Sequence, residues 1–146
     1  MAEFSLPGGA VFKLRTIVEE IHETELIGEV IFNKDDKGVR HLFWVNETGE
    51  KRAIPDEDTA SLFVTQRGFI GVGKDRFTSI NSGQDLPPIT EECFRRTEQN
   101  NMFVILDGRI FYLSSLTLVM KHGWLNRLSE IPLITPDDFQ GNRIHR

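Results

Sequence analysis

The chain has 146 residues, of which 39% are hydrophobic and 27% are charged, the proportions of an ordinary soluble globular protein. Wholesale disorder, a collagen-like repeat and a disulfide-stabilised mini-fold are therefore excluded. The formal charge of -5, from 22 acidic residues against 17 lysines and arginines, also argues against nucleic acid as a partner, because nucleic-acid-binding proteins gain affinity by neutralising phosphates.

A flexible lead-in over residues 1–9, rich in glycine and proline, and a helix over residues 10–23 are the first predicted elements. Apolar residues recur at three- and four-residue intervals from Val11, which is a helical period. The β-branched residues of the segment weaken a helix, so a strand that begins at Phe12 is the alternative.

A three-strand meander is predicted next. The runs Glu25–Phe32 and Val39–Val45 are rich in β-branched and aromatic residues and flank a polar loop, and Glu50–Ile54 supplies a short third strand. Phe43 and Trp44 belong to a stretch of consecutive apolar residues, which is typical of a strand covered on both faces. We therefore expect this strand in the centre of the sheet.

A short helix, a strand and a loop are predicted after the meander. Acidic residues from Asp56 onward favour a helix that ends near Phe63, because acids stabilise a helix N-terminus. Residues 69–72 predict a strand. Residues 73–88 are rich in Gly, Ser, Asn and Pro and predict a loop.

A helix over residues 90–100 and a hairpin over residues 102–113 are predicted in the following segment. Thr90 precedes two glutamates, which is a good helix start. Asp107-Gly108 lies between two apolar runs and is typical of a tight hairpin turn.

The last predicted helix follows this hairpin. Ser114 or Ser115 is expected to cap it, and the helix is expected to carry the apolar residues Leu116, Val119 and Met120, with Leu125 as a further candidate, before Pro132. Residues 132–146 show no clear period and predict an irregular tail.

Together these elements predict an α+β fold in a single domain over residues 1–146. The sheet is expected to be mostly antiparallel and to combine the N-terminal three-strand meander with the C-terminal hairpin. The helices are expected to pack on one face of that sheet.

The segment from Gly68 to Asp75 comes close to a phosphate-binding P-loop, in which glycine amides and a lysine surround phosphate groups. Lys74 is present, but Asp75 stands where the motif has Ser or Thr, and residues 76–81 do not look like the helix that has to follow. We therefore expect no nucleotide site.

Motifs for a metal, a cofactor or a catalytic nucleophile are not found in the sequence. Glu19 and His22 form one copy of a carboxylate–imidazole pair of which di-iron sites need two, and the four histidines fall at no metal-ligand spacing. Cys93 would need a base brought beside it by the fold, and we expect it to be a small apolar residue on the inner face of a helix. We predict no cofactor and no enzymatic activity.

A cytoplasmic location is expected. Cys93 is the lone cysteine, whereas disulfides are typical of oxidising compartments. Residues 1–10 lack the basic and apolar regions of a secretory signal, and no stretch approaches the ~18 apolar residues of a membrane span.

The leading interpretation is a non-catalytic protein-binding module, specifically a small acidic inhibitor or immunity-type protein that neutralises a more basic protein. Acidic residues in predicted loops would steer such a partner toward the chain. The candidate partner-binding residues are Asp35, Asp36, Asp56, Glu57, Asp58, Trp124 and Phe139.

Trp124 has two alternative roles. Gly123 is expected to end the last helix, which could leave the Trp124 ring at a surface, where Trp is a common interface anchor. Packing of the ring in the core is the alternative that we favour.

Two other functions are left open. The first is a structural or chaperone-like subunit of a larger assembly, such as a virion or a secretion machine. The order of the predicted elements and the acidic charge resemble those of the small acidic chaperones that serve bacterial type III secretion, except over residues 55–88. The second is a small metal-dependent hydrolase that uses the clustered acids Asp35-Asp36, Asp56-Glu57-Asp58, Glu91-Glu92 and Asp137-Asp138.

Overall fold

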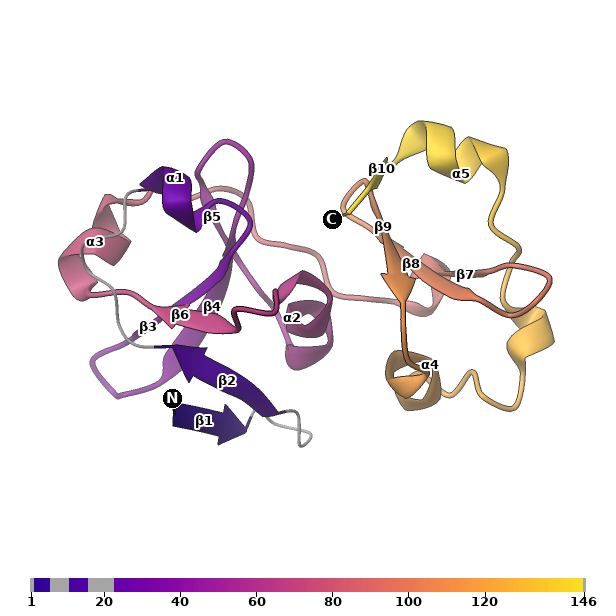
Figure 1. Cartoon of the computed structure of the whole chain (residues 1–146), viewed down its shortest axis with the longest axis horizontal. Coiled ribbons are helices and arrows are strands. Elements are labelled where there is room, and N and C mark those ends of the chain that lie inside the picture. Colours follow the sequence, from indigo (N-terminus) through magenta and orange to yellow (C-terminus); the bar gives the residue numbers. More distant parts are fainter. Residues whose placement is uncertain (1, 6–10, 16–22, 146) are drawn as a thin grey trace. The chain divides into compact units, whose positions relative to one another are not determined.

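The computed structural model describes residues 2–5, 11–15 and 23–145 of the chain. The chain divides into two compact units, residues 1–88 and residues 89–146. Each unit contains one sheet together with helices (Figure 1), so the α+β class is confirmed. The meander and the C-terminal hairpin lie in different sheets, which corrects the prediction of one sheet that combines them.

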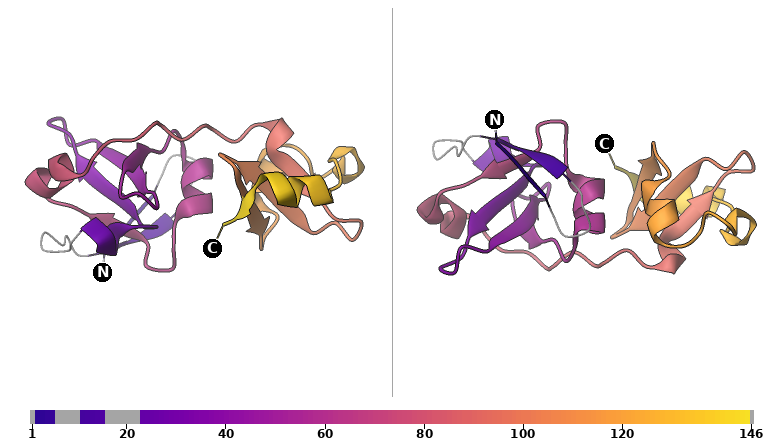
Figure 2. Two further views of the ribbon diagram at one scale, coloured as in Figure 1. Left: turned by 90° about the horizontal axis from the view of Figure 1, so that it is seen from above. Right: turned by 90° about the horizontal axis from the view of Figure 1, so that it is seen from below.

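The first unit holds a six-stranded sheet in the order β1-β2-β6-β3-β4-β5. Figure 2 shows the ribbon from above and from below. Its elements are β1 (Ala2–Ser5), β2 (Val11–Arg15), α1 (Glu23–Leu26), β3 (Val30–Lys34), β4 (Arg40–Val45), β5 (Lys51–Ala53), α2 (Glu57–Phe63), β6 (Phe69–Gly71) and α3 (Lys74–Ser79).

The second unit holds a four-stranded sheet in the order β10-β9-β8-β7. Its elements are the 3-10 turn η1 (Glu91–Cys93), β7 (Phe94–Arg96), β8 (Met102–Leu106), β9 (Arg109–Leu113), α4 (Thr117–Lys121), the 3-10 turn η2 (Leu128–Glu130), α5 (Pro136–Gly141) and β10 (Arg143–Ile144).

Both sheets are mixed, so the prediction of a mostly antiparallel sheet fits only in part. β6 runs parallel to both of its neighbours, β2 and β3, and β10 runs parallel to β9, whereas the remaining pairs are antiparallel. A parallel pair needs a long connection between its strands. Here β4, β5 and α2 together connect β3 to β6.

Helices cover both faces of the first sheet, which corrects the prediction of helices on one face. Successive side chains of a strand point to opposite faces of the sheet, so a strand with consecutive apolar residues places apolar side chains on both faces. On one face, Trp44 lies against α2, with its ring centroid 4.7 Å from that of Phe63. On the other face, a cluster of buried apolar residues packs together: Leu26, Ile31, Val45, Ile70, Val72 and Ile80.

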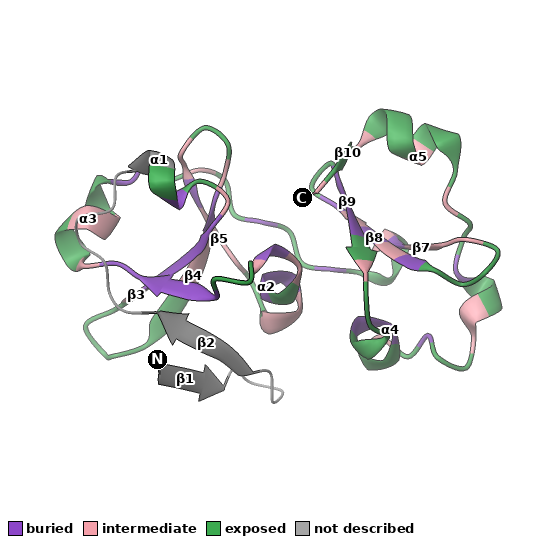
Figure 3. Ribbon diagram, in the orientation of Figure 1, coloured by how far each residue is buried: buried purple, intermediate pink, exposed green. Residues whose placement is uncertain are grey.

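The strand predicted for the sheet centre, β4, is an interior strand between β3 and β5. Trp44 is 1% exposed. Phe43 is half-buried, with its ring edge-on to that of Phe77 at 5.0 Å between centroids. Both faces of β4 are therefore covered, as predicted, while β6 is buried along its whole length (Figure 3).

The N-terminal residues form strands where a lead-in and a helix are predicted. β1 pairs with β2, and β2 pairs with β6, so the alternative of a strand near Phe12 is correct for residues 11–15. The pairing with β6 satisfies the backbone hydrogen bonds of β2 through a segment far along the chain, which local periodicity cannot show. Residues 16–22 of the predicted helix lie outside the described residues.

Two further predictions in the first unit need correction. The strand predicted over residues 25–32 begins only at Val30, because α1 and a turn at Gly28, whose φ is 83°, precede it. The loop predicted over residues 73–88 contains α3. The short helix predicted after Asp56 is confirmed as α2.

Lys51 connects β5 to the C-terminal end of α3. Its Nζ donates to the carbonyl oxygens of Phe77 at 2.9 Å and Ile80 at 2.5 Å, and lies 4.6 Å from the centroid of the Phe77 ring. Burial lowers the pKa of Lys51 from its usual value. The carbonyl acceptors and the ring act in the opposite sense, because both interact favourably with the charged ammonium.

The helix predicted over residues 90–100 is wrong, and η1 followed by β7 takes its place. Phe94 of β7 is fully buried, with its ring centroid 5.1 Å from that of His122 and 6.1 Å from that of Trp124. This packing and the pairing of β7 with β8 outweigh the local helix signal at Thr90, because tertiary contacts override modest propensities.

The hairpin predicted from Asp107-Gly108 is confirmed as β8 and β9. Asp107 has a φ of 56° and Gly108 a φ of 71°, as a primed two-residue turn requires. The sequence signal was local and specific, so the prediction did not depend on distant contacts.

The last helix is confirmed as α4, but its predicted cap is wrong. Leu116 precedes the helix without a side-chain cap, and the Ser115 hydroxyl donates to that of Thr117. Leu116 and Met120 are exposed. The buried residues of α4 are Leu118 and Val119.

The tail predicted to be irregular contains α5 and β10. The Thr135 hydroxyl accepts the backbone N–H of Asp138, and the Asp138 carboxylate accepts that of Thr135, so the two residues form a capping box with Pro136 in the first turn. β10 then pairs with β9. None of the described helices has the length and the hydropathy needed to cross a membrane.

Candidate functional site

Asp35 holds the turn between β3 and β4. Its Oδ1 accepts the backbone N–H groups of Lys37 at 2.8 Å and Val39 at 2.9 Å, and its Oδ2 lies 3.0 Å from Nε2 of His41. The hydrogen bond with His41 lowers the pKa of Asp35, and the backbone N–H groups contribute to the same effect. The structure thus engages this candidate partner-binding residue in a local turn.

Replacing Asp35 by asparagine tests this electrostatic role. The folded-state pKa lies below the ordinary value of 3.8, so the ionised carboxylate stabilises the fold above that value and the stabilisation is lost as the pH falls through the folded-state pKa. The melting temperature of the variant should be below that of the wild type at pH 7, and the difference should shrink as the pH falls below 3.8 and through the folded-state pKa. A difference that is independent of pH would show that only the shape of the turn matters.

Asp36 differs from its neighbour. It is exposed and forms no hydrogen bond or ion pair with another described residue. Its carboxylate is therefore available to a partner without loss of an internal contact.

The second acidic group begins α2. Asp56 accepts the backbone N–H of Thr59 at 2.8 Å and caps the helix, and Glu57 and Asp58 are half-buried residues of the first turn. Acids at these positions stabilise the positive end of the helix dipole. This group therefore has a structural role whether or not it also binds a partner.

Trp124 lies in the core of the second unit. It is 6% exposed, with its ring near that of Phe94, and the Arg127 guanidinium lies 4.3 Å from the ring centroid. The favoured alternative of a core tryptophan is confirmed. The alternative of an exposed Trp124 ring is not seen, because the chain turns the ring inward after Gly123.

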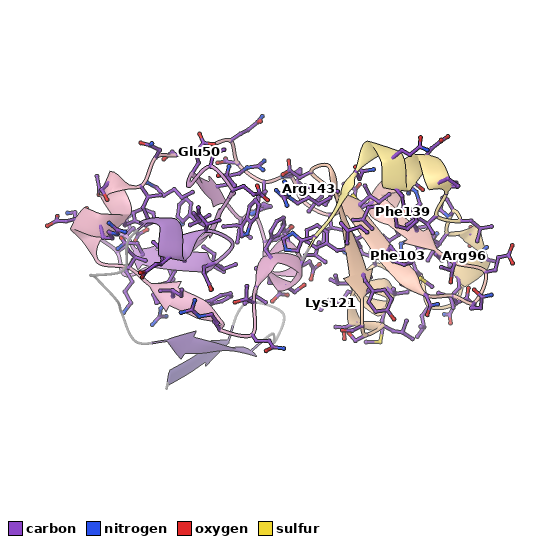
Figure 4. The ribbon with its side chains drawn as sticks, turned by 45° about the horizontal axis from the view of Figure 1, so that its top comes forward. Glu50, Arg96, Phe103, Lys121, Phe139 and Arg143 are labelled. Carbon is purple, nitrogen blue, oxygen red and sulfur yellow. The ribbon has the colours of Figure 1, made fainter. Side chains whose placement is uncertain are left out.

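Phe139 is 44% exposed and belongs to a surface that the sequence analysis did not identify. The ring of Phe103 in β8 packs edge-on against Tyr112 of β9 at 5.5 Å and against Phe139 of α5 at 6.5 Å between ring centroids. Phe103 and Phe139 are labelled in Figure 4. We name Phe103, Tyr112 and Phe139 the aromatic face. The alternation of side chains along the predicted hairpin places Phe103 and Tyr112 on one face, but the contribution of α5 required the tertiary structure.

Exposed apolar side chains are concentrated in the second unit. Of nine large hydrophobic residues that are exposed in the described part of the chain, seven lie in this unit. They are Tyr112, Leu116, Met120, Leu125, Leu133, Phe139 and Ile144.

The net negative charge, in contrast to the exposed apolar side chains, lies in the first unit. Residues 1–88 contain 15 acidic residues and 10 lysines and arginines, whereas residues 89–146 contain seven of each. The whole net charge of -5 therefore belongs to the first unit.

The glycine-rich segment does not form a P-loop, although the reason differs from the one expected. A helix, α3, does follow Gly73. Gly68 precedes β6, however, so the residues between the two glycines form a strand paired with β2 and β3 and cannot surround a phosphate with their N–H groups. At the start of α3 lies a pocket of about 390 Å³ lined by Gly73, Lys74, Asp75 and Arg76.

Metal and nucleophile chemistry gain no support from the described residues. Across residues 25–145, no group of three or more His, Cys, Asp and Glu side chains is placed to hold a metal ion. Cys93 is half-buried, and its Sγ accepts the backbone N–H of Thr90 at 3.4 Å. Glu19 and His22 lie outside the described residues.

Comparison of the chain with models of protein families, with curated proteins and with solved structures finds no match. The functional argument therefore depends on the chemistry of the surfaces described above.

Proposed function

We propose that this chain is a non-catalytic protein-binding module of the cytoplasm that acts as a small acidic inhibitor or immunity-type protein and neutralises a more basic protein. The observation that carries the proposal is the location of the whole net charge of -5 in residues 1–88. A surface with an excess of one charge attracts a partner of opposite charge before contact is made.

Asp36 is the residue best placed to contribute to this attraction. Asp35 and Asp56 each hold backbone N–H groups, so their replacement would change the local structure together with the charge. Asp36 is exposed at the tip of the β3–β4 connection and can be reversed alone. Exposed charges act mainly on the rate of encounter, and short-range contacts act on dissociation.

The test is the association rate of a partner that is captured from source lysate, identified by mass spectrometry and purified. Asp36→Lys should slow association about two- to tenfold and change dissociation by less than about twofold. The wild-type association rate should also fall between about 10 mM and 150 mM salt, because the Debye length decreases from about 30 Å to 8 Å.

Glu98→Lys is the matched control, because it changes the net charge equally but lies in the neutral second unit. It should slow association less than Asp36→Lys does. An association rate that changes neither with salt concentration nor in Asp36→Lys would contradict the inhibitor proposal.

A subunit of a larger assembly is the second candidate function. The observation that favours it is that seven of the nine exposed large apolar residues among the described side chains lie in the second unit, since aromatic residues and Met are enriched in protein interfaces. Size-exclusion chromatography separates the two candidates. A monomer at all concentrations supports the inhibitor, whereas assembly that Tyr112→Ser weakens supports the subunit.

A further inference from the structure

The aromatic face lies on the more exposed side of the second sheet. Side chains of β8 alternate between buried and half-buried, and Phe103 and Ile105 belong to the half-buried set. Phe103 pairs with Tyr112 across the β8–β9 hairpin, and residues paired in this way point to the same side of a sheet. Phe139 of α5 packs against Phe103. The three rings therefore share one surface, with Tyr112 62% exposed and Phe139 44% exposed.

A row of isoleucines lies beside the three rings. Ile105 pairs with Ile110, and Ile110 pairs with Ile144 of β10, so the row continues across three strands. Each of the first two isoleucines lies two residues from a ring of the aromatic face along its own strand, which places the row on the same side of the sheet. Ile144 is 58% exposed at the outer end of the row. The surface therefore combines exposed rings with an apolar strip.

The rings of the aromatic face have no cation over them from the described part of the chain. The negative face of an aromatic ring attracts cations. Cationic side chains of the chain itself lie near three other rings, at 4.3 to 5.9 Å from the ring centroid: those of Phe32, Phe77 and Trp124. No described residue forms this contact with a ring of the aromatic face. These exposed rings therefore remain available to a cation from outside.

The charged groups beside the aromatic face leave no excess of positive charge there. Arg95 is the register partner of Phe103 in β7, but its Nε lies 3.6 Å from the Asp138 carboxylate and its Nη1 donates to two backbone carbonyl oxygens. Arg143 of β10 points to the opposite side of the sheet from the isoleucine row, because side chains alternate along a strand. Asp137 in the first turn of α5 is exposed and has no ion pair with another described residue.

We propose that the aromatic face binds an arginine side chain of the basic partner, with the guanidinium over the exposed ring of Tyr112 and the apolar stem along the isoleucine row. The inference rests on the function proposed above, because it takes the partner to be basic. Arginine fits better than lysine, since a planar guanidinium stacks on aromatic rings and matches a carboxylate such as that of Asp137. In this assignment, the acids of the first unit speed encounter, and the aromatic face slows dissociation.

The test uses the peptide acetyl-Gly-Arg-Gly-Arg-Gly-amide as the probe and the same peptide with citrulline in place of arginine as its matched control. Citrulline keeps the length and the shape of the arginine side chain but carries no charge. NMR titrations follow the ring signals of Tyr112, the single tyrosine of the sequence, and the backbone amide signals of Phe103 and Phe139. The arginine peptide should shift these signals saturably and bind about two- to fivefold more tightly than the citrulline peptide.

Two substitutions of Tyr112 separate the effect of its ring from that of its apolar bulk. Tyr112→Leu keeps an apolar side chain but removes the ring, so it should weaken binding of the arginine peptide about two- to fivefold. Tyr112→Phe keeps the ring and should bind the peptide as the wild type does. Binding to both variants is followed by the backbone amide signals of Phe103 and Phe139. Equal affinities for the two peptides, or equal affinities of Tyr112→Leu and the wild type, would overturn the proposal.

The backbone amide signal of Asp36 separates a failure of this inference from a failure of the inhibitor function. A shift of the Asp36 signal without a saturable shift at the aromatic face would overturn the inference and leave the attraction of basic chains by the first unit intact. Saturable arginine binding at the aromatic face, together with an association rate of the captured partner that does not depend on salt, would support the inference and contradict the inhibitor function. Signals of the aromatic face that change with protein concentration alone, and that the peptide does not affect, would show that a second copy covers this face and would overturn the inference.

Discussion

Replacing Trp44 by alanine should lower the free energy of unfolding by about 3–5 kcal/mol. Trp44 is 1% exposed and packs on Phe63 from an interior strand, so truncation removes a large buried side chain and leaves a cavity. That loss is a large share of the 5–15 kcal/mol that is roughly typical of a domain. Urea denaturation followed by circular dichroism measures it.

The opposite face of β4 is tested by Phe43→Ala, for which we expect a loss near the lower end of that range, about 3 kcal/mol. Phe43 is half-buried against Phe77. Tyr112→Ala is the matched control, because this aromatic residue is 62% exposed. A loss of less than about 1 kcal/mol in Trp44→Ala or Phe43→Ala would contradict the covered position of β4.

The two tryptophans allow the prediction of a single domain to be tested in the same experiments. Trp44 lies in the first unit and Trp124 in the second, so Trp124→Phe leaves fluorescence from the first unit and Trp44→Phe leaves it from the second. Coincident transitions are expected for one cooperative domain. Separate midpoints would identify two domains.

Replacing Lys51 by methionine should lower the free energy of unfolding by about 1.5–3 kcal/mol, the value of hydrogen bonds to a charged group. The ammonium donates to the carbonyl oxygens of both Phe77 and Ile80 at the C-terminal end of α3, where helical carbonyl groups lack intrahelical partners. Methionine keeps the apolar stem of the side chain, so the change isolates the loss of the donors. Urea denaturation followed by Trp44 fluorescence in the Trp124→Phe background measures it.

Lys74→Met is the control for Lys51→Met, because Lys74 is an exposed residue of the same region. Its effect on the free energy of unfolding should stay within about 0.5 kcal/mol. Equal effects of the two variants would mean that Lys51 does not hold the end of α3.

Elements with strong local chemistry were predictable from the sequence. Asp107-Gly108 specifies its turn, because few residues adopt the positive φ values of 56° and 71° that the turn contains. Asp56 specifies the start of α2 through its own side chain. The apolar run around Trp44 likewise predicted a covered strand, because burial follows directly from side-chain chemistry.

Elements that depend on distant pairing were not predictable in this way. β2 and β7 fall in segments with helical signals, and each becomes a strand because another part of the chain satisfies its backbone hydrogen bonds. The position of β6 between β2 and β3 has the same origin. No local period encodes which strand lies beside which.

For the candidate site too, some features were predictable from the sequence and others required the tertiary structure. Composition established the acidic charge, and residue counts show that it belongs to the first unit. Only the tertiary structure buried Trp124 in a core and placed Phe139 beside Phe103. Charge and turn chemistry are properties of residues and their immediate neighbours, whereas burial and hydrogen-bond satisfaction are set by segments brought together from different parts of the chain.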